Sequence, residues 1–585
     1  MKEFRTHLCD EIREEDVGKK VRIAGFVETI RDLGGLVFLD IKDMYGITQV
    51  VISAESKAVD KISHIPIQSV VTVLGTVRKR SKDTINLKLK TGKVEIYIED
   101  IKILGKRTLD LPFEIDGEYL AREDLRLKYR YLDLRRDDLK EKLKLRSKVI
   151  SFLRDEMEKR DFLEVQTPIL TASSPEGARD YLVPSRIHKG KFYALPQAPQ
   201  QFKQLLMCGG IDKYFQIAPC FRDEDARSDR LSGEFYQLDM EMAYVDEEDI
   251  FKIMEEIMYK LFKKFSDREI SKYPFKRITY KEAMEKYGTD KPDLRIPLEL
   301  TDATDIFEKI DLKAFKSQIV KIIGVHGVKD EPRSFFEGMT EYAIKKLKAK
   351  GLAWLRIMDD LSLQGPIAKF IPEDAKKEIL KRTKTKEGDA LFFIADYKKQ
   401  VYKLSGAVRE ELGKRLGLID DEKTEFCWIT DFPMYEYDEK GKLTFCHNPF
   451  SMPKGGEKAL EEEDLLEVKA HQYDLICDGI EIASGAIRNH DPEIMIKVFE
   501  KVGYDKKYIE EKFSAMFKAF KFGAPPHGGI APGIDRLIMI LTKSASIREV
   551  VAFPLSSKAE DLMMGAPSQV TEKQLDELHL KISKI

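Results

Sequence analysis

Residues 221–241 read FRDEDARSDRLSGEFYQLDME, a charged loop between two segments in which polar and apolar side chains alternate. Alternation with a period of two is typical of strands that bury one face against a core. It begins at Tyr214 and continues to Met242, so the segment predicts an antiparallel hairpin within a sheet. The face opposite the core then carries a polar row that includes Gln216, Arg222, Phe235, Gln237, Asp239 and Glu241.

The loop of this hairpin carries Arg222, Glu224 and Arg230. A sheet with one face in water would by itself explain the alternating strands. It would not explain two arginines around one loop, because planar guanidinium groups suit pairwise binding of phosphate oxygens. We therefore interpret the loop as a polyphosphate-binding element.

A second hairpin is predicted at Asp478-Gly479, a strong two-residue turn signal between apolar runs. Counting outward from the turn, Ile476 faces Glu481, which makes Asp474 a diagonal neighbour of Glu481 on the same face. The pair could be two solvent-exposed acids. Two adjacent carboxylates can also bind a cation between them. Because carboxylate oxygens next to a phosphate-binding loop are typical ligands of Mg²⁺, the pair indicates a magnesium site.

Further along the same strand, Ser484-Gly485 breaks the apolar pattern. Glycine inside a strand often marks a bulge, which re-aims the side chains that follow. Our hypothesis is that a bulge here turns Arg488 toward the two carboxylates.

Residues 527–533, HGGIAPG, lead into a predicted helix over 534–541 whose only charged residues are Asp535 and Arg536. We expect Pro532 in the first turn of this helix. A helix that is apolar on nearly all sides is buried, so Arg536 needs an anionic partner. That partner is either a neighbouring acid such as Asp535 or a bound phosphate. The phosphate is favoured because two other arginines already indicate one.

Five short strands separated by turns are predicted near the N-terminus, over 21–30, 36–42, 47–52, 70–80 and 93–103. They predict a small barrel of the OB type. Phe38 points outward with Asp40 and Lys42, and residues 78–93 are rich in cations. An outward aromatic beside cations is typical of surfaces that stack single-stranded bases, although a generic barrel without a partner is the alternative.

The composition excludes several classes of protein. With 43% apolar residues among 585, the chain can form several cores, which excludes a disordered protein. A net charge of −2 excludes a uniformly basic nucleic-acid coat. The six cysteines lie far apart without metal-ligand spacing, so reduced thiols are expected. The charged start and the lack of a membrane-length apolar run predict a cytoplasmic protein with no membrane partner.

Several of these segments resemble motifs of one enzyme family. Residues 221–241 resemble motif two of the class II aminoacyl-tRNA synthetases, and GGIAPGIDRL at 528–537 resembles motif three. The predicted helix 136–159 and the extended segment after it resemble motif one, which helps form the dimer interface in that class. SSPEGARDYLVPSR at 173–186 and QAPQQFKQLLM at 197–207 are similar to the aspartyl-tRNA synthetases. The resemblance covers essentially the whole chain.

The resemblance implies an α+β multidomain fold. Its parts are an OB-type β-barrel, a six- or seven-stranded antiparallel sheet flanked by helices, and an inserted α/β domain often called GAD. The implied limits are an anticodon-binding barrel at 1–107, a hinge at 108–135, a catalytic domain at 136–283 and 426–562, the insertion at 284–425 and a C-terminal extension at 563–585.

The implied activity is ATP-dependent attachment of L-aspartate to tRNA(Asp) through an aspartyl-adenylate, by a homodimer that uses Mg²⁺. The alternative is an enzyme that also charges tRNA(Asn) with aspartate. A histidine at the position of Leu33 accompanies this relaxed choice in the family, so Leu33 favours the strict type. The large insertion, with Arg488 and Lys203, disfavours an asparaginyl-tRNA synthetase. The retained Arg222 and Arg536 disfavour a noncatalytic tRNA-binding relative.

The resemblance also assigns residues. The implied catalytic residues are Arg222, on the α-phosphate of ATP, and Arg536, on the γ-phosphate. The implied ATP site comprises Arg222, Glu224, Arg230, Phe235, Glu481, Gly533, Ile534, Asp535 and Arg536. The implied magnesium ligands are Asp474 and Glu481. The implied aspartate site comprises Glu176, Gln200, Lys203, Arg222, Gln237, Asp239, His447 and Arg488. The implied anticodon readers are Arg31, Leu33, Phe38, Gln49 and Glu95.

Overall fold

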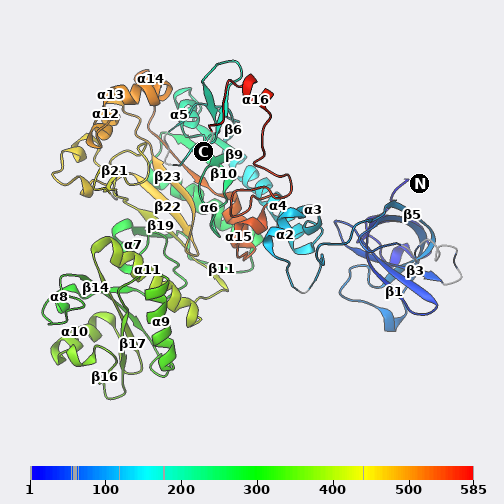
Figure 1. The fold of residues 1–585 in the computed structure, drawn as a ribbon, viewed down its shortest axis with the longest axis horizontal. Helices are drawn as coiled ribbons and strands as arrows, with labels where there is room; N and C mark the ends of the chain where they lie inside the picture. Colours follow the sequence, from blue (N-terminus) through cyan, green and yellow to red (C-terminus); the bar gives the residue numbers. More distant parts are fainter. Residues whose placement is uncertain are drawn as a thin grey trace. The chain divides into compact units, whose positions relative to one another are not determined.

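The computed structural model describes residues 3–53, 56, 62, 65–117, 119–174, 178–438 and 440–583. The chain divides into two compact units. One comprises Met1–Leu125 with Arg135–Lys140, and the other comprises Arg126–Leu134 with Glu141–Ile585. Figure 1 shows the elements of both.

The smaller unit contains a closed five-stranded barrel with strand order β1-β2-β3-β5-β4. Its strands are β1 (Lys20–Asp32), β2 (Leu36–Lys42), β3 (Ile47–Ser53), β4 (Val70–Lys79) and β5 (Val94–Gly105). Leu39 and Ile41 point into a core of aliphatic side chains, as their alternation predicts. The barrel prediction is confirmed, with strand ends displaced by at most two residues.

The larger unit is built on an eight-stranded sheet with strand order β12-β19-β22-β23-β24-β10-β9-β6. Its strands are β6 (Leu163–Glu164), β9 (Lys213–Arg222), β10 (Gly233–Ala243), β12 (Lys276–Thr279), β19 (Phe426–Thr430), β22 (Gln472–Cys477), β23 (Ile480–Ile487) and β24 (His527–Pro532). The six inner strands are antiparallel, but each edge strand runs parallel to its neighbour. Parallel pairing requires a crossover, and the chain between β12 and β19 supplies one of about 150 residues. The expected antiparallel sheet is confirmed for its six inner strands, but the sheet has eight strands instead of six or seven, because a parallel strand is added at each edge.

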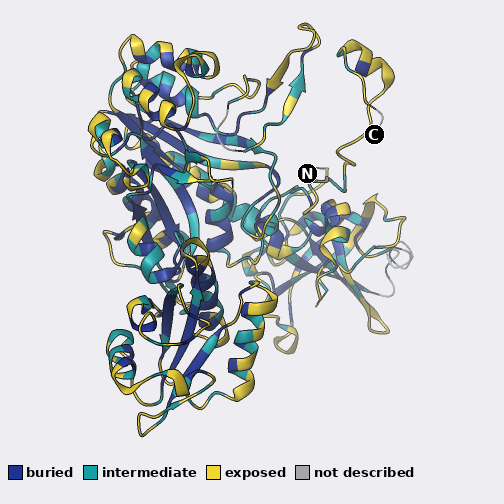
Figure 2. Ribbon diagram, turned by 60° about the vertical axis from the view of Figure 1, so that its left-hand side comes forward, coloured by how far each residue is buried: buried dark blue, intermediate teal, exposed yellow. Residues whose placement is uncertain are grey.

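Helices cover one face of this sheet. α4 (Asp137–Glu158), α6 (Glu247–Phe265) and α15 (Ile534–Leu541) bury their apolar sides on it, together with Met240, Leu475 and Ile530 from the strands. In Figure 2 the inner strands are mostly buried. The predicted helix 534–541 is confirmed. Pro532, however, ends β24 instead of opening the helix, because Gly533 intervenes as the N-cap residue.

The other face of the sheet stays polar and open at its centre. α5 (Gln200–Cys208) contacts strands β9 and β10 and packs against α14 (Ser514–Lys521). α12 (Pro492–Lys501), α13 (Lys506–Lys512) and α14 share a second apolar cluster. Because the helices flank this face and do not cover it, the polar rows of β10 and β23 border a cavity.

Between β12 and β19 the chain forms a separate antiparallel sheet with strand order β13-β14-β17-β15-β16. Its strands are β13 (Leu300–Asp302), β14 (Ile319–Val325), β15 (Ala353–Ile357), β16 (Leu363–Gln364) and β17 (Ala390–Asp396). Its helices are α7 (Tyr280–Tyr287), α8 (Thr304–Phe307), α9 (Arg333–Lys345), α10 (Glu373–Thr383) and α11 (Lys398–Arg415). Apolar clusters line both faces of this sheet. The expected domain limits stay predictions.

The remaining elements are short connections. They are η1 (Glu14–Asp16), η2 (Lys82–Thr84), α2 (Glu123–Lys128), α3 (Arg130–Asp133), β7 (Leu182–Pro184), β8 (Phe192–Ala194), β11 (Glu269–Ile270), η3 (Ala368–Phe370), β18 (Lys423–Thr424), β20 (Tyr435–Tyr437), β21 (Leu443–Phe445), η4 (Gly456–Glu461), η5 (Leu465–Glu467), η6 (Ile547–Val550) and α16 (Glu572–Glu577). Within the described residues, none of the helices is long and apolar enough to cross a membrane.

Candidate active site

The hairpin of residues 221–241 forms as predicted. β9 and β10 pair in register, with Gln216 opposite Asp239 and Arg222 opposite Gly233. Phe215 and Met240 lie in the core on the helix-covered side. The polar row faces the other side, where it lines a cavity of about 550 Å³.

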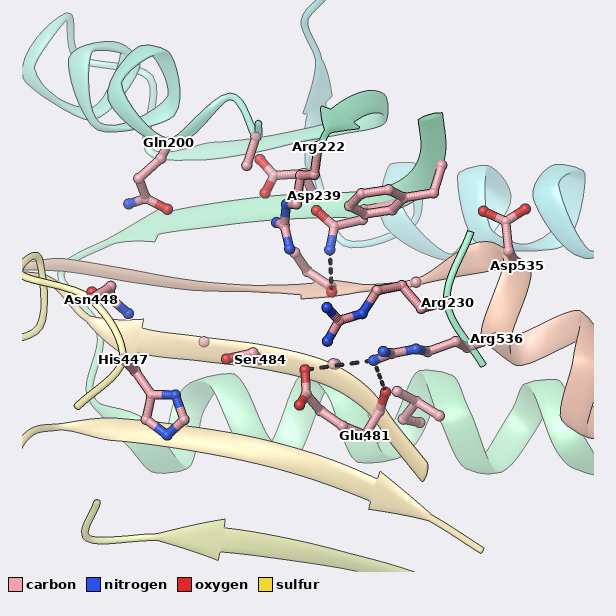
Figure 3. Close-up of a pocket in the computed structure, with 18 of the residues that line it drawn as sticks. Gln200, Arg222, Arg230, Asp239, His447, Asn448, Glu481, Ser484, Asp535 and Arg536 are labelled. Atoms are coloured by element: carbon pink, nitrogen blue, oxygen red, sulfur yellow. Dashed lines mark hydrogen bonds and ion pairs between the residues drawn. The ribbon is translucent and has the colours of Figure 1, made fainter. Parts of the chain in front are cut away.

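This cavity brings together most of the site residues predicted from sequence (Figure 3). The predicted residues that line it are Gln200, Lys203, Arg222, Glu224, Arg230, Phe235, Gln237, Asp239, His447, Glu481, Arg488, Gly533, Asp535 and Arg536. Two others do not line it: Ile534 is fully buried in the core, and Asp474 is covered beside Glu481. Glu176 lies outside the described residues.

Arginines occupy one end of the cavity. The Arg222 guanidinium lies over the Phe235 ring, 4.9 Å from its centroid, and its Nε donates to the Gln197 carbonyl at 3.3 Å. Among the described residues, no carboxylate lies within ion-pair distance of Arg222. Arg230 pairs with Glu224 at 2.8 Å. Arg222 is thus positioned by a ring and a carbonyl, and no ion pair within the described residues offsets its charge.

Arg536 takes its anionic partners from other elements. Its Nε donates to the Asp229 carbonyl at 3.1 Å, and its Nη1 lies 3.6 Å from Glu481 Oε1. Asp535 instead forms an ion pair with Arg146 and accepts from the Tyr236 amide at 3.0 Å. Of the two partners proposed for Arg536, neighbouring acids are found, but Asp535 is not one of them.

The second hairpin places its two carboxylates together, although its register differs from the simple count. Ile476 faces Glu481 as predicted, but a bulge follows, so Asp474 faces Ser484. The bulge therefore falls at Ile482 and not at Ser484-Gly485. Asp474 is fully buried, and burial together with Glu481 raises its pKa well above the usual value. Its Oδ1 has no hydrogen-bond partner within the described part of the chain.

Lys291 also reaches this carboxylate pair. It lies in the segment between α7 and β13, and its Nζ is 3.1 Å from Glu481 Oε2 and 2.8 Å from Asp290. Burial alone would lower the pKa of Lys291, but Glu481 and Asp290 raise it. Burial would raise the pKa of Glu481, but Lys291 and Arg536 lower it. Glu481 is therefore held ionised between two cations.

The opposite end of the cavity contains a buried group of four charges. Lys203 Nζ lies 2.7 Å from Asp239 and 3.4 Å from Glu241. Arg488 donates from Nε and Nη2 to the two oxygens of Glu241, at 2.8 and 3.2 Å. Burial raises the pKa of Asp239, and its Oδ2 has no partner among the described residues. Lys203 and Arg488 are thus compensated before any ligand binds.

On the barrel, four of the five predicted anticodon readers form one connected surface. Arg31 lies opposite Phe38 in the β1–β2 register. Its Nη2 donates to Gln49 at 3.3 Å, and Gln49 donates to Glu95 at 2.9 Å. Leu33, between β1 and β2, is 73% exposed.

Comparison with known proteins identifies the family. Residues 122–557 match the model described as tRNA synthetases class II (D, K and N), and residues 21–104 match that of an OB-fold nucleic acid binding domain. The chain belongs to the class II tRNA synthetases. The predicted family and fold class of this synthetase are therefore confirmed.

The relatives of this synthetase extend over its full length. An aspartate–tRNA ligase of Streptomyces coelicolor is 52% identical, covering 100% of this chain and 99% of that protein. An aspartate–tRNA(Asp/Asn) ligase of Rickettsia prowazekii is 53% identical, covering 100% and 98%. Among solved structures, the asparaginyl-tRNA synthetase of Pyrococcus horikoshii complexed with asparaginyl-adenylate matches with a TM-score of 0.58 at 20% identity, covering 94% and 97%. That match shows the shared fold.

Sequence reasoning missed several residues of the synthetase's pocket. Lys291 was overlooked because it lies inside the predicted insertion, although only three residues beyond Gly288, where α7 ends. Glu241 had a signal, since it stands in the predicted polar row of β10, but its pairing with Arg488 required the sheet order. No sequence pattern marked Gln204 or His527 as part of the site. Both are buried and do not line the cavity themselves.

Proposed function

We propose that this synthetase attaches L-aspartate to tRNA(Asp) in two steps at this cavity. First, an oxygen of the aspartate α-carboxylate attacks the α-phosphorus of ATP, and diphosphate leaves to give aspartyl-adenylate. A terminal ribose hydroxyl of the tRNA then attacks the carbonyl carbon, and AMP leaves. The single observation that carries the proposal is one cavity lined both by Arg222 and Arg536 and by Lys203 and Arg488.

The arginine end suits the triphosphate. The substrate's carboxylate is already ionised at neutral pH, so adenylation needs positioning and charge neutralisation more than a general base. We assign the α-phosphate to Arg222, which has no ion pair among the described residues, and the γ-phosphate to Arg536 and Arg230. The adenine ring would stack on Phe235, with Glu224 beside it, in the part of the cavity that Gly533 lines.

Asp474 and Glu481 fit a magnesium ion. The buried Asp474 Oδ1, which has no hydrogen-bond partner in the described part of the chain, and the ionised Glu481 beside it would supply two hard oxygen ligands. The described residues contain no group of three or more His, Cys, Asp or Glu side chains arranged for a metal. Mg²⁺ commonly takes only one or two carboxylates together with substrate phosphates, so the pair suffices. When bound, the ion would neutralise phosphate charge.

The four-charge end suits the amino acid. We propose that Lys203 and Arg488 hold the aspartate side-chain carboxylate, while Gln200 and Asp239 accept hydrogen bonds from the α-ammonium group. Gln237, His447 and Glu176 complete the proposed site. Asparagine has no side-chain carboxylate to share between Lys203 and Arg488, so it gains much less than aspartate at this end, and we expect a discrimination that makes editing unnecessary.

The barrel would read the anticodon with Arg31, Phe38, Gln49 and Glu95. The second candidate function is the charging of tRNA(Asn) as well as tRNA(Asp). It is favoured by the name of the Rickettsia prowazekii relative. Leu33 favours the strict type. Charging purified tRNA(Asp) and tRNA(Asn) with labelled aspartate tests both: we expect product with tRNA(Asp) alone. Equal charging of both would replace the strict assignment, and no charging of either would refute the function.

We also propose that the protein acts as a cytoplasmic homodimer. Leu163, in the segment that resembles motif one, and Ile169 and Leu170, directly after it, are each about half exposed. Clustered exposed apolar side chains are typical of surfaces that bind a partner. Sedimentation of the purified protein is expected to give twice the mass of one chain.

A further inference from the structure

A line of three hydrogen-bonding side chains runs from the cavity wall into the protein. Gln200 lines the cavity, and its Nε2 donates to Gln204 Oε1 at 3.1 Å (Figure 3 shows Gln200). Gln204 Nε2 lies 3.1 Å from His527 Nε2. Gln204 and His527 are completely buried. Residues 200 and 204 stand one turn apart on α5, so the helix aligns the two amides.

The direction of every bond in this line follows from its inner end. His527 Nδ1 lies 2.8 Å from the Pro525 carbonyl oxygen, which can only accept, so Nδ1 carries the hydrogen. Burial lowers the pKa of His527, which keeps the ring neutral and leaves Nε2 as an acceptor. Gln204 must therefore turn its NH₂ group toward His527 and its oxygen toward Gln200.

The same logic fixes Gln200. Its NH₂ group is engaged by the Gln204 oxygen, so its own carbonyl oxygen is the atom left for the cavity. Within the described residues that oxygen makes no hydrogen bond. An α-ammonium group has only donors, so it binds an amide oxygen and is repelled by an amide NH₂ group.

We propose that His527 is a positioning residue for amino acid recognition, whose unprotonated Nε2 sets the direction of the Gln204 and Gln200 amides so that an acceptor faces the α-ammonium of the substrate. The proposal rests on the proposed function, since it assumes aspartate as the substrate. His527 touches no substrate and acts through the side chains of Gln204 and Gln200. A histidine that merely fills the core would have no influence on which atom of Gln200 faces the cavity.

The test compares aspartate with succinate, which keeps both carboxylates but lacks the amino group. In His527→Phe the inner acceptor is gone and the amides can reverse. We expect the KM for aspartate in ATP/pyrophosphate exchange to rise roughly 10- to 100-fold, the range of one charge-assisted hydrogen bond. The KM for ATP and the inhibition constant of succinate should stay within about twofold, since neither ligand uses the amide oxygen.

Two further variants make the result decisive. Gln204→Leu breaks the same line without altering His527, and it should reproduce the aspartate-specific loss if His527→Phe fails to fold. In a Gln200→Ala background, His527→Phe should add nothing, because residues that act through one another are not additive.

Three results would overturn the proposal: equal weakening of succinate and aspartate, a full additive effect of His527→Phe in the Gln200→Ala background, or a wild-type aspartate KM in both His527→Phe and Gln204→Leu. A wild-type protein without aspartate-dependent exchange would refute the proposed function instead, so the two failures are distinguishable.

Discussion

Lys203 and Arg488 lie against Asp239 and Glu241 before any substrate is present. Two buried cations and two buried carboxylates compensate each other, which keeps the empty pocket from holding unpaired charge. An entering aspartate carboxylate must share cations that already have partners. Selectivity for aspartate over asparagine then depends on the position of the two cations, because only an anionic side chain placed between Lys203 and Arg488 can bind both at once.

Arg488→Leu is expected to lower aspartate-dependent ATP/pyrophosphate exchange by about a thousandfold or more, since a buried recognition charge is lost and Glu241 is left unpaired. The measurement is exchange at saturating ATP. Arg409→Leu is a matched control, because Arg409 is equally buried but donates to the Leu298 and Ile296 carbonyls. It should lower the melting temperature without raising the aspartate KM. Near wild-type exchange by Arg488→Leu would refute the assignment.

Lys291→Met should strengthen binding of a divalent cation to the free protein. The ammonium group 3.1 Å from Glu481 competes with any cation at that carboxylate, so its removal should tighten Mn²⁺ binding by roughly tenfold. Titration of free Mn²⁺ by electron paramagnetic resonance measures this directly. Lys454→Met is the control, because Lys454 pairs with Glu247 and Asp431 and does not line the cavity. Unchanged Mn²⁺ affinity in Lys291→Met would show that Lys291 does not compete at the site.

The β22–β23 turn supports the segment that carries Lys291. Asp478 pairs with Arg268 at 2.6 Å and lies 3.5 Å from Arg295. Gly479 has φ of +80°, and a Cβ there would lie 2.9 Å from the Asp293 Cβ. The hairpin of the carboxylate pair and the 290–295 segment are therefore packed as one piece.

Gly479→Ala should consequently destabilise the protein more than an alanine at another left-handed glycine. Gly503, with φ of +88°, has no neighbouring atom within 4 Å of the place a Cβ would take. Gly503→Ala therefore loses stability only through the strain of an alanine in the left-handed backbone conformation. We expect Gly479→Ala to lose about 1–3 kcal/mol more in denaturant unfolding, because of the added steric contact. Equal losses in the two variants would show that Asp293 simply moves aside.

Periodicity and turn chemistry predicted most of these elements. The β9–β10 hairpin with its polar and apolar faces and the Asp478-Gly479 turn follow from local rules, because strand period and turn type are local properties. The bulge at Ile482 could not be predicted, since it depends on how β23 fits between β22 and β24. Lys291 was missed for a similar reason: no local pattern shows that a residue of the insertion reaches back to Glu481.

The two proposed recognition tasks lie in different compact units. The cavity belongs to the larger unit, and the surface with Arg31, Phe38, Gln49 and Glu95 belongs to the barrel. Adenylation uses ATP and aspartate alone, whereas transfer also requires tRNA. Substitutions in the barrel should therefore affect one step only.

Phe38→Ala is expected to raise the KM for tRNA about tenfold or more, the effect of one lost base-stacking platform, while ATP/pyrophosphate exchange stays unchanged. Aminoacylation and exchange assays on the same preparation measure the two effects. Tyr45→Ala is the control, since Tyr45 is an exposed aromatic of the barrel between β2 and β3, away from the Arg31 surface. A loss of exchange in Phe38→Ala would contradict the separation of tasks.

ATP/pyrophosphate exchange by the purified wild-type protein without tRNA tests whether one cavity holds a nucleotide triphosphate beside an acidic amino acid. We predict Mg²⁺-dependent exchange that requires L-aspartate and is at least a hundredfold weaker with L-asparagine. Exchange supported equally by both amino acids, or by neither, would contradict the account.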